Sequence, residues 1–93
     1  MPELTRVLIV DDHLEMAKTL ADALGDRGYA TVAVGSGREA IQRLEAEDFD
    51  AVITDLRMSD ADGLEVLATA RRLSPERPVI VMNYPERIKA FYM

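Results

Sequence analysis

Apolar and polar positions alternate along the chain in two different periods. Four short apolar runs, rich in β-branched residues, predict strands at residues 6–10, 29–34, 51–54 and 79–82. Between these runs, apolar side chains recur every three or four positions, which is the period of an amphipathic helix. The intervening helices are expected over residues 13–26, from Ser36 onward, and over residues 63–73.

Local signals support the ends of these helices. Ser36 followed by Glu39 matches a capping box, in which the serine oxygen accepts the amide of the third helical residue. Gly25 and Gly28 stand where a left-handed C-terminal cap is expected for the first helix. For the last helix, we expect the apolar stripe at Leu64, Leu67, Ala70 and Leu73.

The predicted order is strand, helix, strand, helix, strand, helix, strand. Strands that alternate with helices of this length imply right-handed crossovers and a parallel sheet covered on both faces, a doubly wound α/β fold. In such sheets, ligands bind beyond the carboxyl ends of the strands. Functional residues are therefore expected directly after the apolar runs.

Three carboxylates follow the apolar runs. Asp11 and Asp12 come directly after the first strand, and Asp55 follows the third. Clustered carboxylates repel each other unless a cation lies among them, and oxygen ligands of this kind suit Mg²⁺. A carboxylate beside such an ion can attack phosphorus to give an acyl phosphate. The alternative is that Asp11 and Asp12 only cap the following helix.

Composition excludes several classes of function and of site. A chain of 93 residues supports one small domain, and a net charge of −6 argues against direct nucleic-acid binding. The absence of cysteine excludes disulfides and thiolate metal sites. The sequence shows no membrane-spanning run and no signal-peptide pattern, so a cytoplasmic protein is expected. His13, the only histidine, is expected to be a surface residue at a helix start rather than a phosphohistidine or a metal ligand.

Three motifs together resemble the receiver domains of two-component response regulators. They are VLIVDD at residues 7–12, DAVITDLRMSDADG at residues 50–63 and PVIVM at residues 78–82. The resemblance implies a flavodoxin-like receiver fold. It also implies that Asp55 is the phosphoacceptor, taking phosphate from a sensor histidine kinase. Asp11, Asp12 and Asp55 would then bind Mg²⁺ together with the backbone carbonyl of Arg57.

The sequence departs from the receiver pattern at three points. Ser59 stands where the loop pattern usually has proline. Asn83 stands at the position of the Ser or Thr that bonds the phosphoryl group, although an amide can still donate there. The lysine that ends the fifth strand of receivers has no counterpart in the same context.

The end of the chain departs furthest from the receiver pattern. Residues 1–93 are interpreted as a single, incomplete receiver domain, with residues 83–93 as an atypical tail and the fifth strand and last helices missing or altered. This would leave residues 79–82 as an exposed apolar edge that invites pairing with another chain. We therefore expect a dimer or a domain-swapped oligomer.

Three functions stay open at this point. The first is a phosphorylated receiver that relays the signal to an effector domain or protein. The second is a truncated or pseudo-receiver that associates through its sheet edge without switching. The third, a metal-dependent phosphohydrolase, would need an acid two residues after the nucleophile, and Arg57 stands there instead.

Overall fold

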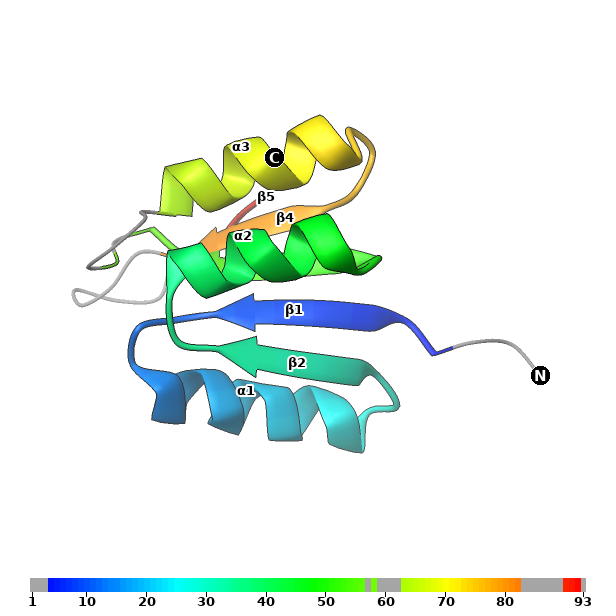
Figure 1. The fold of residues 1–93 in the computed structure, drawn as a ribbon. Coiled ribbons are helices and arrows are strands. Elements are labelled where there is room, and N and C mark those ends of the chain that lie inside the picture. Colours follow the sequence, from blue (N-terminus) through cyan, green and yellow to red (C-terminus); the bar gives the residue numbers. More distant parts are fainter. Residues whose placement is uncertain (1–3, 57, 59–62, 83–89, 93) are drawn as a thin grey trace.

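The computed structural model describes residues 4–56, 58 and 63–82, and the backbone of residues 90–92. Within these residues, strands and helices alternate as the hydrophobic periods predict (Figure 1). The elements are β1 (Arg6–Val10), α1 (Leu14–Asp26), β2 (Ala30–Val34), α2 (Gly37–Ala46), β3 (Ala51–Asp55), α3 (Gly63–Leu73), β4 (Val79–Met82) and β5 (Ala90–Tyr92).

The sheet has the strand order β2-β1-β3-β4-β5. Strands β1 to β4 are parallel, which confirms the predicted doubly wound α/β class. The register pairs Val10 of β1 with Thr54 of β3, so these two central strands end at the same level. Their carboxyl ends, and the residues that follow them, therefore meet at one edge of the sheet.

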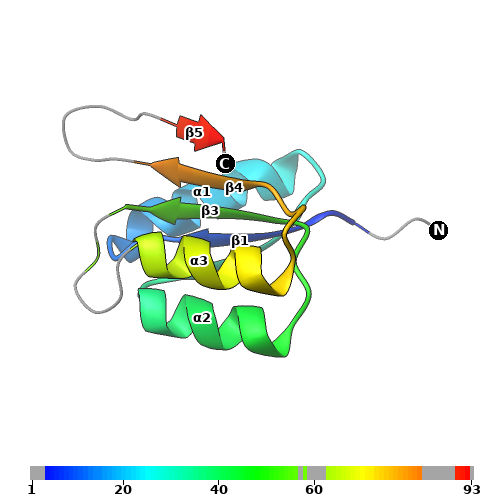
Figure 2. The same ribbon diagram turned by 90° about the horizontal axis from the view of Figure 1, so that it is seen from above.

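Helices cover both faces of the sheet. Figure 2 shows α1 on one face and α2 with α3 on the other. Along β1, Leu8 and Val10 pack with the α2 and α3 side, whereas Val7 and Ile9 pack with α1. Because successive residues of a strand point to opposite faces, a strand covered on both sides is apolar at every position. The unbroken run in β1 has this cause.

The predicted helix ends are confirmed. The Oγ of Ser36 accepts the amide of Glu39 at 3.0 Å and caps α2. Gly28 adopts a φ of 97°, and its amide donates to the carbonyl of Gly25 at 3.0 Å. The amide of Tyr29 reaches the carbonyl of Leu24 at 3.1 Å, which completes the two-bond cap that ends α1.

The apolar face predicted for α3 is wrong in part. Leu64 and Leu73 are exposed at 57% and 41%, while Val66 and Ala70 are fully buried. The helix turns its small residues toward β3 and β4, since Gly63 at its first position packs directly on the end of β3. This close approach rotates the larger leucines outward. Leu67 lies between these extremes, partly buried against the core.

The predicted exposed edge at β4 is also wrong. Residues 90–92 return antiparallel to β4, and Ile80, Val81 and Met82 pair with them in register. The edge is therefore covered by the chain's own backbone, and β5 becomes the outermost strand. The fifth strand, expected from the sequence to be missing or altered, is a three-residue strand whose direction is opposite to that of the other four. In the part of the chain that is described, no helix is both long and apolar enough to cross a membrane.

A charged network joins the start of β1 to the end of α2. Glu47 pairs with Arg6 at 2.8 Å and with Arg43 at 2.7 Å. The Arg6 guanidinium also donates to the carbonyl of Asp48 at 2.8 Å and lies 4.7 Å from the centre of the Phe49 ring. Hydrogen bonds from Arg6 and then Arg43 lower the pKa of Glu47 below its usual 4.5.

This network predicts a loss of stability in acid. Above pH 4.5, Glu47 is charged in the folded and unfolded chain alike, and its bonds stabilise the fold in full. As the pH falls further toward the lowered folded pKa, the unfolded chain takes up a proton first, so stability is lost. Urea unfolding between about pH 6 and pH 3 should show a shallower decline for Glu47→Gln than for the native chain.

The matched control is Glu45→Gln. Glu45 is exposed on the same helix, and its carboxylate lies 3.6 Å from the Arg72 guanidinium. This variant should keep the acid-dependent decline of the native chain, because a single exposed pair contributes little. Equal slopes for the native chain and Glu47→Gln would contradict the stabilising role of the network.

Candidate functional site: the carboxylate cluster

The three candidate carboxylates meet at the carboxyl ends of β1 and β3. Asp55 is the last residue of β3, and Asp11 and Asp12 follow the last residue of β1. Because β1 and β3 are adjacent and end in register, the two strands bring these side chains together without any contribution from a flexible loop. The prediction that the three carboxylates meet at one edge of the sheet is confirmed.

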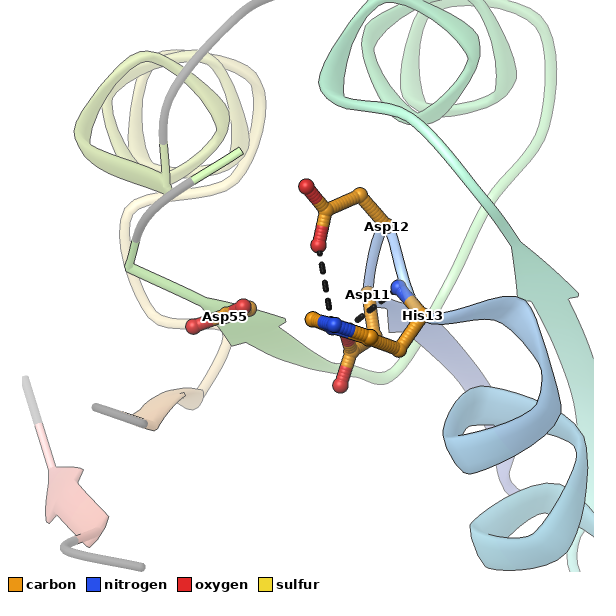
Figure 3. A group of neighbouring side chains, drawn as sticks. All are labelled: Asp11, Asp12, His13 and Asp55. Atoms are coloured by element: carbon orange, nitrogen blue, oxygen red, sulfur yellow. Dashed lines mark hydrogen bonds and ion pairs between the residues drawn. The ribbon is translucent and has the colours of Figure 1, made fainter. Parts of the chain in front are cut away.

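The cluster is compact and partly buried. One ligand atom from each of Asp11, Asp12, His13 and Asp55 can be chosen so that all lie within 4.8 Å of one another. Asp11 and Asp55 are only 1% and 4% exposed, whereas Asp12 is open to solvent. Figure 3 shows Asp55 facing the Asp11–His13 turn across the sheet edge. The site thus has two carboxylates at its base and one at its rim.

Asp11 also organises the start of α1. Its Oδ1 accepts the backbone amide of His13 at 2.9 Å, and its own amide donates to the carbonyl of Val34 at 3.2 Å. His13, and neither aspartate, occupies the N-cap position of α1, and its side chain makes no capping bond. The capping alternative is therefore right only in that Asp11 orders the turn before the helix.

His13 lies closer to the carboxylates than a plain surface residue at a helix start would. Its side chain is 75% exposed at the helix start, as predicted, but the ring turns inward. The Nδ1 atom lies 3.4 Å from Asp11 Oδ1 and 3.3 Å from Asp12 Oδ1 (Figure 3). The only sequence signal was the adjacency of His13 to the acid pair, and adjacency does not determine where a ring points.

Gly63 supports the site from the opposite side. Its amide donates to the carbonyl of Leu56 at 2.9 Å, so the first turn of α3 rests on the end of β3. A Cβ added here would overlap the carbonyl oxygen of Asp55 and would stand 2.7 Å from the Cα of Leu56. Only glycine allows this approach. Gly63 is the last residue of the motif at residues 50–63, and the motif alone does not reveal this contact with Asp55.

Three predicted positions lie outside the described residues. They are Arg57, expected to offer its carbonyl to the metal, Asn83 at the switch position, and Ser59 in the loop. The end of β4 that leads to Asn83 is described, and Met82 is paired with Asp55. Leu56 donates its amide to the carbonyl of Met82 at 2.8 Å, which holds the two strand ends together.

The residues present fit a hard divalent cation. All three carboxylates supply oxygen ligands, and two of them are buried where their mutual repulsion is poorly screened. A cation among them offsets this repulsion, and the exposed Asp12 leaves a side from which the ion and its waters can enter. The donor set is therefore suited to Mg²⁺.

Comparison with known proteins agrees with this geometry. The model of the response regulator receiver domain family matches residues 7–91. The transcriptional regulatory protein GlrR of Escherichia coli K12 is 38% identical over 77 residues, covering 83% of this chain and 17% of the relative. The transcriptional regulatory protein TcrA of Mycobacterium tuberculosis H37Rv is 36% identical over 78 residues, covering 84% and 31%. The chain thus spans about a sixth to a third of these curated relatives.

Solved structures show the same fold. A response regulator receiver protein from Sinorhizobium medicae superimposes with a TM-score of 0.83 at 31% identity, covering 87% of this chain and 67% of that one. The response regulator TrrA from Thermotoga maritima, in complex with Mg²⁺-BeF, gives a TM-score of 0.81 at 28% identity, covering 89% and 73%. The chain belongs to the receiver domains of response regulators, which are signalling modules rather than classical enzymes.

Proposed function

We propose that Asp55 accepts phosphate from the phosphohistidine of a sensor histidine kinase, with Mg²⁺ held by Asp11, Asp12 and Asp55. The observation that carries this proposal is the convergence of the three carboxylates within 4.8 Å at the ends of β1 and β3. The histidine kinases of two-component systems present their phosphohistidine in the cytoplasm, and we propose the same compartment for this chain.

The proposed transfer follows from the chemistry of the carboxylate. A carboxylate oxygen of Asp55 attacks phosphorus, the bond between phosphorus and the histidine nitrogen breaks, and the released imidazole takes up a proton. Bound Mg²⁺ would neutralise the charge of the phosphoryl oxygens during transfer. The pairing of Asp55 with Met82 in the sheet holds the backbone of the nucleophile in place.

The aspartates of the first strand have different proposed tasks. Asp11 is buried, and its carboxylate accepts the His13 amide. It is therefore suited to orienting the turn and to supplying negative charge to the ion from the buried side of the site. Asp12 is exposed and is the better placed direct ligand of the ion. The carbonyl of Arg57 is proposed, on the family resemblance, to complete the protein ligands.

The signal must pass to a second component. The relatives GlrR and TcrA are named transcriptional regulatory proteins, and this chain matches 17% and 31% of their lengths. We propose that the phosphorylated state is relayed to an effector domain or an effector protein. Association into a dimer or a swapped oligomer stays a prediction, and with β4 covered by β5 the open edge no longer supports it.

A second candidate is a receiver that accepts phosphate without switching conformation. Asn83 favours it, because this residue replaces the Ser or Thr that bonds the phosphoryl group in receivers. In the described part of the chain, β5 also runs antiparallel to β4, whereas the fifth strand of that family is parallel. Acceptor chemistry needs only the carboxylates and the ion, whereas switching needs a second state that the phosphoryl group stabilises.

Amide spectra with beryllofluoride, a phosphoryl mimic, test the proposal and its alternative together. With Mg²⁺ present, the mimic should shift the amides of Asp11, Asp12, Asp55 and Leu56, because it would bind at the carboxylate of Asp55. Amides at the far ends of α1 and α2 should overlap with those of the free chain if the switch is lost. Large shifts there would contradict the second candidate.

The control is Asp55→Asn under the same conditions. This variant keeps the size of the side chain but lacks the carboxylate to which the mimic bonds, so its spectrum should not respond to beryllofluoride. An unchanged spectrum for the native, folded chain with Mg²⁺ and the mimic would contradict the acceptor function itself.

A further inference from the structure

We propose that His13 is a fourth ligand of the metal site when an imidazole-binding first-row ion such as Zn²⁺ occupies it, whereas Mg²⁺ is held by the carboxylates without the ring. This inference rests on the metal site of the proposed function. It goes beyond that function because it adds a nitrogen ligand to the three carboxylates. Imidazole suits Zn²⁺, Cu²⁺ and Ni²⁺, whereas Mg²⁺ selects oxygen ligands and water.

The spacing of the donor atoms suits a shared ion. Nδ1 of His13 lies 3.4 Å from Asp11 Oδ1 and 3.3 Å from Asp12 Oδ1. Ligand atoms that each stand about 2.0–2.1 Å from one Zn²⁺ are about 3.3–3.4 Å apart at a tetrahedral angle. The separation of the imidazole nitrogen from each of these two carboxylate oxygens therefore matches that of two ligands of one ion.

A metal ion can bind the facing atoms together. A carboxylate oxygen offers lone pairs, and Nδ1 of an imidazole protonated at the other ring nitrogen offers one as well. A divalent ion among them offsets the charge of both carboxylates that face the ring.

The backbone fixes the point from which the ring extends. The amide of His13 is bonded to Asp11 Oδ1 at 2.9 Å, and the carbonyl of His13 accepts the amides of Met16 and Ala17 at 2.9 and 3.2 Å. These bonds fix the residue between the acid pair and the first turn of α1. Because the side chain is 75% exposed, an ion can reach Nδ1 from solvent without opening the core. Figure 3 shows the ring extending from α1 toward Asp55.

Nuclear magnetic resonance of the imidazole tests this inference directly. His13 is the only histidine of the sequence, so its ring signals need no separation from others. ZnCl₂ and MgCl₂ are titrated separately into the native chain, following the ring ¹⁵N signals and the backbone amides. We expect Zn²⁺ to shift Nδ1 together with the amides of Asp11, Asp12 and Asp55, and Mg²⁺ to shift these amides while the ring signals stay in place.

The variant His13→Gln measures the contribution of the ring. Mutating a residue that only hydrogen-bonds a metal ligand typically lowers metal affinity by about 10- to 100-fold. Loss of a direct ligand should therefore weaken Zn²⁺ binding at least about tenfold. Mg²⁺ affinity should change by less than about twofold, since Mg²⁺ does not recruit imidazole. The matched control is Glu15→Gln, an exposed residue of the same helix outside the cluster, which should leave both affinities unchanged.

The outcomes separate the two proposals. If Zn²⁺ shifts the aspartate amides but not the ring, or if His13→Gln binds Zn²⁺ as the native chain does, the role of His13 is overturned and the carboxylate site stands. If Asp12→Asn leaves Zn²⁺ affinity unchanged, the ion binds elsewhere and the inference is also overturned. If neither ion shifts the aspartate amides of the folded chain, the metal site of the proposed function fails, and His13 has no site to join.

Discussion

Replacing Gly63 with alanine is expected to lower the free energy of unfolding by about 3 kcal/mol, the upper end of the usual cost of overpacking. The added Cβ would overlap the carbonyl oxygen of Asp55 and stand 2.7 Å from the Cα of Leu56. Both atoms belong to the backbone, so no side-chain rotation can relieve the contact. The first turn of α3 would have to move away from β3 and lose the 2.9 Å bond from Gly63 to Leu56.

Gly25→Ala is the matched control. Gly25 lies within α1, and a Cβ added there meets no atom within 4 Å. Because glycine costs a helix interior about 0.5–1 kcal/mol relative to alanine, this variant should be slightly more stable than the native chain. Urea unfolding followed by circular dichroism gives both values. Equal stability of Gly63→Ala and Gly25→Ala would contradict the close packing of α3 on β3.

The same substitution should also affect the acceptor, because the contact is with Asp55 itself. A displaced strand end moves the carboxylate relative to Asp11 and Asp12, on whose spacing the metal site depends. The effect of Gly63 thus reaches both the stability and the chemistry of the domain.

The second large effect is expected from Asp55→Asn, which should abolish phosphoryl transfer to the chain. The amide that replaces the carboxylate has the same shape but carries no negative oxygen to attack phosphorus. The fold should persist, because the variant removes one of three clustered negative charges and keeps the volume of a residue that is 4% exposed. Unfolding free energy is expected to stay equal or to rise, as is common when a crowded functional site loses charge.

Local sequence signals were sufficient for the elements and for most of the site. The caps at Ser36 and Gly28 and the two hydrophobic periods placed the first seven elements, because each of these signals acts within a few residues. The meeting of Asp11, Asp12 and Asp55 followed from a rule about parallel sheets: strands that end in register present their next residues at one edge.

What the sequence left undetermined depends on contacts between distant residues. The buried face of α3 is set by the approach of Gly63 to β3, so a count of leucines at helical spacing selected Leu64 and Leu73 wrongly. The direction of β5 depends on how the chain returns to β4, and three residues of pattern do not distinguish parallel from antiparallel pairing. The orientation of the His13 ring toward the carboxylates is likewise not predicted by any sequence pattern.

The intact mass of the chain after incubation with a small phosphodonor tests the central claim most directly. With Mg²⁺, the native chain should gain the mass of one phosphoryl group, and it should gain none when Mg²⁺ is removed by a chelator. Asp55→Asn, shown to be folded by its amide spectrum, should gain none under either condition. A folded native chain that gains no mass with Mg²⁺, or an Asp55→Asn variant that gains as much as the native chain, would contradict the assignment of Asp55 as the phosphoacceptor.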